Sequence, residues 1–281
     1  SRDPKGESLI YFIDVDSNDP QKVISENRES ILRKGDVGFF DENGLMPSSI
    51  LKRAGNYYLF YSGWSRRASS PYANYTGLAK SNDARTFSKA CPGPVLSQLI
   101  NDPLSATSPC VVEHKGRYLM FYCSGMKWIK IEGKLEHTYD IKLALSNDLV
   151  TWKQGVETII AQSDEFDAIT RPWIFSVTGM SFIFYCRRSS RDFRDGEGSY
   201  RVYYRFINLD TLKIGQEVEV KFGLGKATVG FDTMQCYPCV QTVDNKHFLF
   251  LNGNGFGRNN LGFSEISIKS GSKEPAQNRY V

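Results

Sequence analysis

The strongest constraint on the fold is an internal repeat with a period of about 63 residues. The tripeptide Ser-Asn-Asp begins at Ser17, Ser81 and Ser146, and a related Asn-Leu-Asp begins at Asn208. A second motif, in which a proline precedes a β-rich run, a turn and an aromatic-rich run, begins at Pro47, Pro109, Pro172 and Pro238. Successive copies of either motif lie 62 to 66 residues apart. Because a fixed period is typical of repeat architectures, the chain is predicted to consist of similar modules.

Each repeat contains short runs that favour β-strands. The proline motif reads as a hairpin, as in PCVVEHKGRYLMFYCSG, where two runs rich in Val, Tyr and Phe flank the turn residues HKG. A third run precedes each Ser-Asn-Asp, and a shorter fourth run follows it. Four strands per repeat, with hardly any helical periodicity, are typical of a β-propeller.

The number of runs predicts how the chain is divided into blades. The third run occurs five times but the leading hairpin only four times, and the segment before Ser17 aligns with the end of a repeat. We therefore predict an all-β, single-domain, five-bladed β-propeller of four-stranded blades, whose first blade lacks its leading strands in this chain. The predicted blades are residues 1–36 (partial), 37–97, 98–161, 162–222 and 223–281. A four-bladed ring with an extra half blade is the alternative.

Composition and charge exclude several classes of protein. Of the 281 residues, 41% are hydrophobic, as in an ordinary globular chain and unlike a disordered one. The net charge of +4 is too small to predict binding to nucleic acid or to an anionic membrane, and no apolar run is long enough to span a membrane. Six cysteines, mostly in strand-like runs, favour reduced thiols and a cytoplasmic location. Without an initiator Met, the chain is expected to begin inside a longer gene product.

An acidic residue stands five to seven positions before each repeated proline. These residues are Asp41, Asp102, Asp167 and Asp232. In a propeller the loops that enter the innermost strands converge at one mouth, so residues far apart in sequence can meet there. Two carboxylates at such a mouth suit glycoside hydrolysis, in which one protonates the leaving oxygen and the other acts as base or nucleophile. The alternative is that each Asp only caps a turn through backbone amides.

The segment from Arg187 to Arg201 predicts a site for an anionic ligand. It holds five arginines and is long for a hairpin connection, and long loops on rigid scaffolds often carry binding. Guanidinium groups suit carboxylates and phosphates, which indicates an acidic sugar or a sugar phosphate. The predicted ligand-binding residues are Arg171, Arg191, Arg194, Arg201, Tyr200, Trp64 and Asn254. A solvated or internally paired loop is the alternative.

Other chemistries have little support in the sequence. The three histidines lack HExxH spacing, and neither a GxSxG elbow nor a P-loop occurs. Cys236 and Cys239 form one CxxC without a second, so a zinc site is not predicted. We therefore expect neither a metal nor a cofactor.

Several motifs together resemble a known superfamily. They are PSSI followed by YYLFYSGW, TSPCV, TRPWIF with its SSRDFR loop, and CYPCV with NGNGFG. Their order resembles the five-bladed propeller glycosidases that include invertase-like and arabinanase-like enzymes. The similarity is greatest to bacterial members associated with surface-polysaccharide gene clusters, and it extends over nearly the whole chain.

The resemblance implies three catalytic carboxylates: a base or nucleophile on the first blade's leading strand, a second Asp and a Glu acid. That leading strand is absent here, and the Arg-Asp-Pro signature of the invertase-like relatives reads Thr170-Arg171-Pro172. By position, Asp41, Asp167 and Asp232 are the catalytic candidates. The predicted function is a glycoside hydrolase or related transferase acting on an acidic or surface-polysaccharide sugar. The alternatives are a noncatalytic carbohydrate-binding or polysaccharide-assembly propeller and, more remotely, a protein-interaction propeller.

Overall fold

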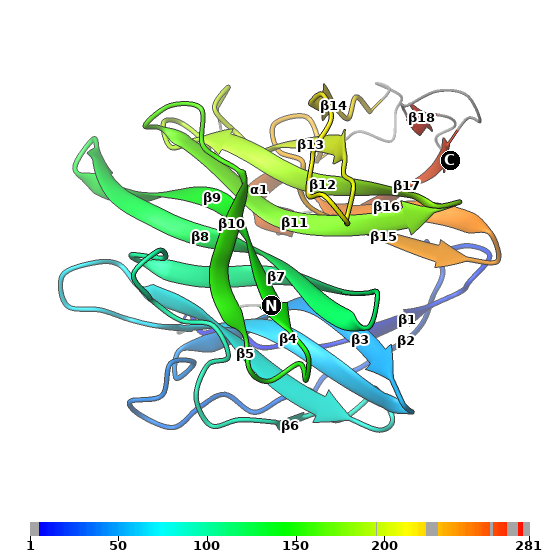
Figure 1. The fold of residues 1–281 in the computed structure, drawn as a ribbon, viewed down its shortest axis with the longest axis horizontal. Helices are drawn as coiled ribbons and strands as arrows, with labels where there is room; N and C mark the ends of the chain where they lie inside the picture. The colour runs from blue at the N-terminus through cyan, green and yellow to red at the C-terminus, as the bar shows by residue number, and fades with distance from the viewer. Residues whose placement is uncertain (1–5, 195, 223–229, 259–260, 269–274, 278–281) are drawn as a thin grey trace. The chain divides into compact units, whose positions relative to one another are not determined.

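The computed structural model describes residues 6–194, 196–222, 230–258, 261–268 and 275–277. These residues form β-strands throughout most of their length, and the helix α1 (Asn254–Gly257) is a single turn. The all-β prediction is therefore confirmed (Figure 1). Contacts divide the chain into two units, Ser1–Ile160 and Ala161–Val281, which are described separately.

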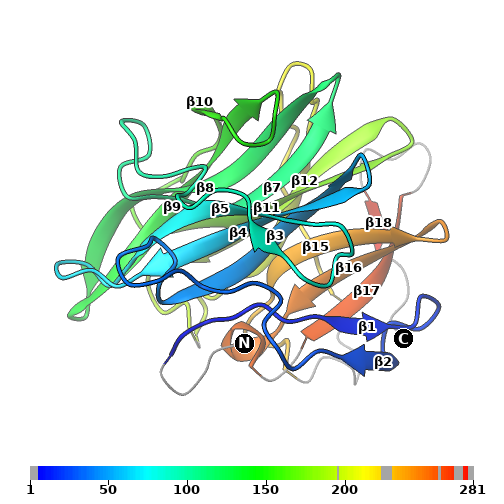
Figure 2. The same ribbon diagram turned by 90° about the horizontal axis from the view of Figure 1, so that it is seen from below.

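The first unit contains two four-stranded antiparallel meanders and a separate pair of strands. Neighbouring strands in each meander follow one another in sequence, as Figures 1 and 2 show for β3 to β5 and for β7 to β9. The pair is β1 (Ile13–Val15) and β2 (Val23–Glu26). The meanders are β3 (Gly44–Arg53), β4 (Asn56–Ser65), β5 (Ala73–Ser81) and β6 (Ser88–Lys89), then β7 (Ser105–His114), β8 (Arg117–Ile131), β9 (Lys134–Ser146) and β10 (Lys153–Ile160).

The second unit contains two further four-stranded meanders. They are β11 (Asp167–Val177), β12 (Met180–Ser189), β13 (Arg201–Phe206) and β14 (Val218–Glu219), then β15 (Cys236–Val243), β16 (Lys246–Asn252), β17 (Leu261–Ile268) and β18 (Pro275–Gln277). Each four-stranded meander falls within one of the ranges predicted for a complete blade, and the number of blades stays a prediction.

Strand β4 is almost continuously apolar because side chains pack on both of its faces. In β4, Leu59 and Tyr61 pack in a cluster with Leu45, whereas Phe60 between them packs on the opposite face with Leu78. Successive side chains of a strand point to opposite faces, so a strand buried on both sides loses the usual alternation of polar and apolar residues. The run YYLFY therefore belongs to a strand with apolar packing on both faces.

The repeated proline marks a β-bulge in the first strand of each meander. The pairing register shifts between Thr107 and Cys110, and equivalent shifts occur in β3, β11 and β15. The residue before the proline has positive φ in three copies: Ser108 (52°), Arg171 (56°) and Tyr237 (62°). A proline cannot donate a ladder hydrogen bond, so it is tolerated in an inner strand where a bulge interrupts the ladder.

The amide of the bulged residue is bound by the preceding meander in two copies. The Ser108 amide donates to Ser62 Oγ at 2.9 Å, and the Tyr237 amide donates to Cys186 Sγ at 3.1 Å. Ser62 and Cys186 each follow the tyrosine of the aromatic run, so they are equivalent positions. Cys186 thus has a polar role that its buried, strand-like surroundings did not predict.

The Ser-Asn-Asp motif forms the turn between the third and fourth strands. Asp83 Oδ1 accepts from the amides of Arg85 (2.7 Å) and Thr86 (3.0 Å), and Asp148 Oδ1 bonds the equivalent amides. These bonds lower the pKa of Asp83 to about 2. The motif is therefore structural, because its carboxylate is consumed by the turn that it closes.

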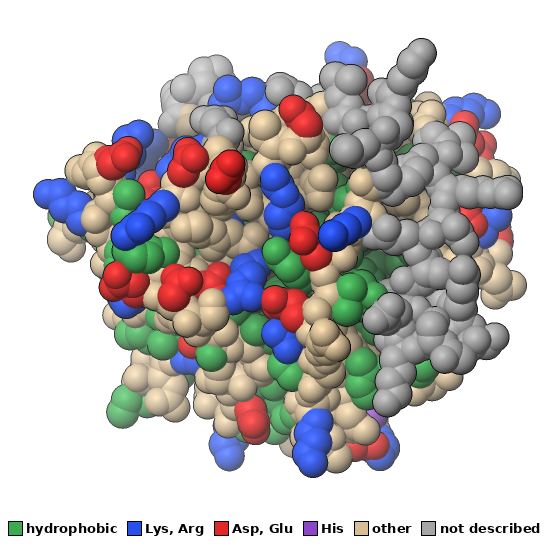
Figure 3. Space-filling view, turned by 90° about the horizontal axis from the view of Figure 1, so that it is seen from above, with side chains coloured by type: hydrophobic (Ala, Val, Ile, Leu, Met, Phe, Trp, Pro, Cys, Tyr) green, Lys and Arg blue, Asp and Glu red, His purple; other side chains and the backbone are tan. Residues whose placement is uncertain are grey.

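The surface carries both signs of charge. On the face drawn in Figure 3, basic and acidic side chains of the described residues are interspersed. In the described part of the chain, no helix is long and apolar enough to cross a membrane.

Candidate functional site

The first repeated carboxylate, Asp41, lies enclosed in the first unit. Its side chain has no exposed surface. Asp41 Oδ2 accepts from Tyr61 Oη at 3.0 Å and pairs with Lys89 Nζ at 2.6 Å. Gly35 lies against the other oxygen, where a Cβ would come within 2.3 Å of Oδ1. In this conformation the carboxylate joins the loop before β3 to β4 through Tyr61.

Asp102 has the same arrangement in the next meander. Tyr122 Oη donates to both of its oxygens, at 3.0 and 3.1 Å, and Gln154 Nε2 donates to Oδ2 at 2.8 Å. Lys142 Nζ lies 3.7 Å from Oδ1, and the Asp102 side chain is fully buried. In both meanders, therefore, the repeated Asp is bound by the tyrosine that stands 20 residues later on the second strand.

Removing this tyrosine hydroxyl is expected to destabilise the protein. Tyr122→Phe removes a hydroxyl that donates to buried Asp102 and accepts from the Gly155 amide, so the free energy of unfolding should fall by about 1–3 kcal/mol. Tyr118 is the matched control because it lies on the same strand, is equally buried, and its hydroxyl has no hydrogen-bond partner among the described residues. Tyr118→Phe should leave stability unchanged or raise it. Urea denaturation of both variants tests the difference, and equal losses would contradict the assigned role of Tyr122.

Asp167, in the second unit, is bound by an arginine. Arg187, which again stands 20 residues later, donates from Nη2 to Asp167 Oδ2 at 2.6 Å. The amide and hydroxyl of Ser163 both donate to the same oxygen at 2.9 Å. Burial raises the pKa of Asp167, but the hydrogen bonds from Arg187 and Ser163 outweigh burial, so the pKa is lowered. Asp167 is thus ionised at neutral pH.

The same arginine joins Asp167 to a second carboxylate that the sequence did not single out. Arg187 Nη1 donates to Glu217 Oε1 at 2.7 Å, and Arg205 Nη2 lies 3.2 Å from Glu217 Oε2. Tyr185 Oη also donates to Glu217. Glu217 directly precedes β14 in the run QEVEV, which the sequence predicted only as a fourth strand. The pairing of Glu217 with Arg187 forms only when two segments distant in sequence come together in the fold. The local sequence therefore gives no sign of it.

The predicted arginines of the β12–β13 loop lie over aromatic rings. The Arg191 guanidinium is 3.6 Å from the ring centroid of Phe166, and the Arg194 guanidinium is 4.3 Å from that of Phe193. Arg188, which was not singled out, is buried: its guanidinium lies 3.9 Å from the Phe193 centroid, and its Nε donates to Tyr200 Oη at 3.0 Å. Arg191 and Arg194 are exposed and can meet a ligand, whereas Arg188 orders the loop.

Three loops of the second unit meet around this arginine. We call the described residues 190–194, 196–200, 230–235 and 253–258 the loop cluster. Phe256 packs edge to face against both Phe193 and Tyr200, with ring centroids 6.3 and 5.9 Å apart. Arg201 Nη1 donates to the Thr233 carbonyl at 2.7 Å, which ties the first loop to the second. Tyr200 and Arg201 therefore build the cluster instead of extending into solvent.

Asp232 and Asn254, both predicted site residues, are in direct contact in the loop cluster. Asn254 Nδ2 donates to Asp232 Oδ1 at 2.6 Å, and Asn254 Oδ1 accepts from the amides of Thr233 and Met234. The hydrogen bond from Asn254 lowers the pKa of Asp232. Asp232 is exposed. It is thus an ionised carboxylate that a ligand can reach.

The remaining predicted residues lie at the bulges and strand ends. Arg171 is the half-buried, positive-φ residue of the β11 bulge in the second unit. Trp64 ends β4 in the first unit, where its Nε1 donates to Ser8 Oγ at 2.8 Å. None of the ten predicted site residues is contradicted by this placement, and their roles stay predictions.

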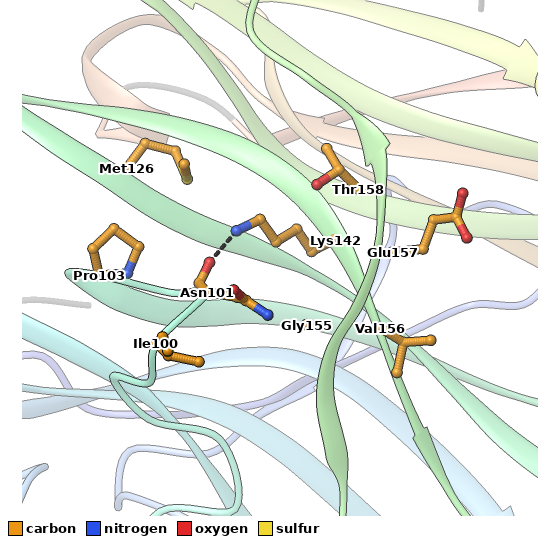
Figure 4. A pocket seen from close by; sticks show the side chains of 9 residues that line it. All are labelled: Ile100, Asn101, Pro103, Met126, Lys142, Gly155, Val156, Glu157 and Thr158. Carbon is orange, nitrogen blue, oxygen red and sulfur yellow. Dashed lines mark hydrogen bonds between the residues drawn. The ribbon is translucent and has the colours of Figure 1, made fainter.

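A cavity of about 470 Å³ lies in the first unit, where its lining includes Asn101 and Pro103 on either side of Asp102 (Figure 4). Its lining includes Met126, Lys142 and Glu157, and the Lys142 ammonium donates to the Asn101 carbonyl beside it. Among the residues that the structure describes, no group of three or more His, Cys, Asp or Glu side chains could hold a metal ion.

Comparison with known sequences gives relatives without an assigned activity. No family model matches the chain. It is similar to the uncharacterized protein Rv1502 of Mycobacterium tuberculosis, with 29% identity over 269 residues, which cover 94% of this chain and 85% of the relative.

Solved structures with a similar fold include glycosidases. The GH32 β-fructofuranosidase BmSUC1 of Bombyx mori has a TM-score of 0.61 and 16% identity, over 82% of this chain and 49% of the enzyme. A variant of the same enzyme in complex with sucrose gives a TM-score of 0.64 with 16% identity, over 88% of this chain and 52% of the variant. The α-L-arabinanase of Cellvibrio cellulosa, also as a variant, has a TM-score of 0.56 and 16% identity, over 83% and 77% of the two chains. The chain spans about half the length of the silkworm enzyme. It has the fold of the invertase-like and arabinanase-like propeller glycosidases, as the sequence motifs predicted.

Proposed function

We propose that this protein acts on a glycosidic bond, as a hydrolase or related transferase, with Asp232 of the loop cluster as its base or nucleophile. The observation that carries this proposal is the state of Asp232, which is the exposed member of the three candidate carboxylates and is kept ionised by Asn254. A base or nucleophile must be deprotonated and must reach the sugar, and Asp232 meets both requirements. The fold shared with β-fructofuranosidases and arabinanases supports a sugar as the substrate.

Asp167 has a different proposed role. Its pKa is lowered and its oxygens are bound by Arg187 and Ser163, so it is unsuited to donate a proton. We assign it to hold Arg187 in place and to contribute negative charge at the start of β11. Asp41, in the other unit, is proposed to fix its loop against β4. Its side chain has no exposed surface and is bound by Tyr61 and Lys89, as that role requires.

A noncatalytic carbohydrate-binding or polysaccharide-assembly propeller is the second candidate. Two observations favour it: Asp41 is enclosed, and Asp167 is committed to an ion pair. A binding module needs arginines and aromatic rings at its loops but no accessible pair of carboxylates. The loop cluster satisfies that requirement through Arg191, Arg194 and the rings beneath them.

One experiment separates the two candidates. The chain is incubated with neutral and acidic oligosaccharides, and released reducing ends are measured beside binding by calorimetry. Catalysis predicts release of reducing ends that increases with enzyme concentration. Binding of a sugar without any release supports the noncatalytic candidate, and the absence of both contradicts a carbohydrate function.

The exposed arginines are expected to select an anionic ligand. Replacing Arg191 and Arg194 together by Ala removes two cations that lie over Phe166 and Phe193, so affinity for acidic oligosaccharides should fall about tenfold. Affinity for neutral oligosaccharides should stay within about twofold. A control is Lys130→Ala, which removes an exposed cation from the β8–β9 hairpin. Equal loss of neutral and acidic ligands would contradict charge selection.

A further inference from the structure

The β8–β9 hairpin is longer than its equivalents in the other meanders. β8 has 15 residues and β9 has 13, against 10 and 9 in β4 and β5, 10 and 6 in β12 and β13, and 7 and 8 in the described β16 and β17. Since the shorter hairpins complete their sheets, the fold does not require the extra length. Elaborations of this kind at strand ends often carry binding.

The extra length carries an aromatic stack. Trp128 on β8 stands directly opposite His137 on β9, and the two rings are parallel within 8° with centroids 3.8 Å apart. Tyr72, from the β4–β5 loop, is nearly perpendicular to both, with its centroid 5.2 Å from Trp128 and 5.7 Å from His137. Figures 1 and 2 draw the ends of these two hairpins on the same side of the first unit.

These distances show which face of Trp128 is covered. One face lies on His137. If Tyr72 lay over the other face, its distance to His137 would exceed its distance to Trp128 by nearly the spacing of the stack. The two distances are almost equal, so Tyr72 lies beside the stack, against the edges of both rings. The outer face of Trp128 is therefore covered by neither ring, and Trp128 is partly exposed.

The inner ring of the stack, His137, is buried and hydrogen bonded. His137 is only 2% exposed, and its Nδ1 is 2.7 Å from Tyr139 Oη. Tyr139 Oη is in turn 3.4 Å from Tyr72 Oη, so two hydroxyl groups lie at the edge of the stack. A ring whose orientation is fixed before binding loses little entropy when it takes up a ligand. Trp128 is thus a flat surface that stacks on a buried, hydrogen-bonded ring.

We propose that the outer face of Trp128 is a carbohydrate-stacking subsite, which takes the C–H face of a pyranose or furanose ring. The C–H face of a sugar is flat and apolar while its hydroxyls point outward, so it matches the outer face of a partly exposed indole. The choice of a sugar as ligand rests on the proposed function. The subsite belongs to the first unit and uses none of the candidate carboxylates.

The test uses an array of bacterial surface polysaccharides and plant oligosaccharides probed with the full chain and its variants. Trp128→Ala and Trp128→Leu remove the aromatic face, the second while keeping apolar volume over His137, and both should weaken binding about tenfold. Trp128→Phe should keep most of the binding. The matched control is Lys130→Ala, an exposed change on the same hairpin, which should bind as the parent does. Thermal melting of each variant checks that the hairpin remains folded.

Each outcome decides a different point. Selective loss in Trp128→Ala and Trp128→Leu supports the subsite. If the parent binds glycans and Trp128→Leu binds them equally, the subsite is wrong while the proposed function stands. If the parent neither binds nor cleaves any glycan on the array, both proposals are wrong.

Discussion

Asp232→Asn is expected to lower glycosidic turnover by about 10²–10⁴-fold while leaving ligand affinity and melting temperature nearly unchanged. Asn keeps the shape of the side chain but cannot accept a proton or attack a sugar carbon. Asp232 is exposed, so no buried partner is left unsatisfied by the change. The measurement is the rate of reducing-end release at saturating substrate, beside a binding titration.

Asp244→Asn is the matched control for this variant. Asp244 is also exposed and belongs to the same meander, in the β15–β16 turn at the end opposite to the loop cluster. Its φ of 48° is one that Asn tolerates well. Turnover should therefore be unaffected by Asp244→Asn. If both variants kept full activity, Asp232 would not be the base or nucleophile.

The assignment of Asp232 as base or nucleophile can also be tested through the pH dependence of activity, because Asn254 lowers the pKa of Asp232. Activity that needs the ionised carboxylate should therefore persist below the usual range for Asp, near 3.9. Asn254→Ala removes the donor and raises the pKa of Asp232 toward that range. The acidic limb of the pH–rate profile should then move to higher pH. If Asn254 only shaped the loop, the acidic limb would stay where it is in the parent.

The sequence predicted the strands well because their signal is local and repeated. In the aromatic run of β4, Phe60 and Tyr61 pack on opposite faces of the strand, so consecutive residues are apolar and the run is easily recognised. The period of the repeat then located the equivalent runs along the sequence. The repeated Pro was expected to precede a β-rich run, whereas it lies within the first strand and marks a bulge, whose amide is bound by Ser62 or Cys186 of the preceding meander in two copies. That bond joins separate repeats, so no single repeat could reveal it.

The candidate site was harder to predict because a carboxylate's role depends on what encloses it. Asp41 and Asp232 occupy equivalent places in their repeats, yet one is buried against Tyr61 and the other is exposed beside Asn254. The tyrosine 20 residues after Asp41 was visible in the sequence, as was Tyr122 after Asp102. Read as pairs, they would have indicated that these carboxylates fix loops. Glu217 had no comparable signal.

Arg187→Met is expected to lower the free energy of unfolding by about 2–4 kcal/mol at neutral pH. The change leaves Asp167, whose side chain is 6% exposed, without its cation, and it removes a donor from Glu217. The two bonds from Ser163 remain, and Arg187 itself is partly exposed, so the loss should be smaller than for a fully buried pair. Guanidinium denaturation of the variant beside the parent measures it.

The pH dependence of this loss identifies its cause. The pKa of Asp167 is lowered in the folded parent, so its contribution to stability is present above the unfolded value, near 3.9, and is lost as the pH falls through the folded pKa. In Arg187→Met the hydrogen bonds and charge of Arg187 no longer lower the pKa of Asp167, so its folded pKa rises from the value in the parent. The stability difference between parent and variant should therefore shrink as the pH is lowered through this range. Arg187→Met combined with Asp167→Asn should recover part of the loss at pH 7, because the unpaired charge is gone. A difference that stayed constant down to pH 3 would show that Arg187 stabilises the protein through packing of its stem alone.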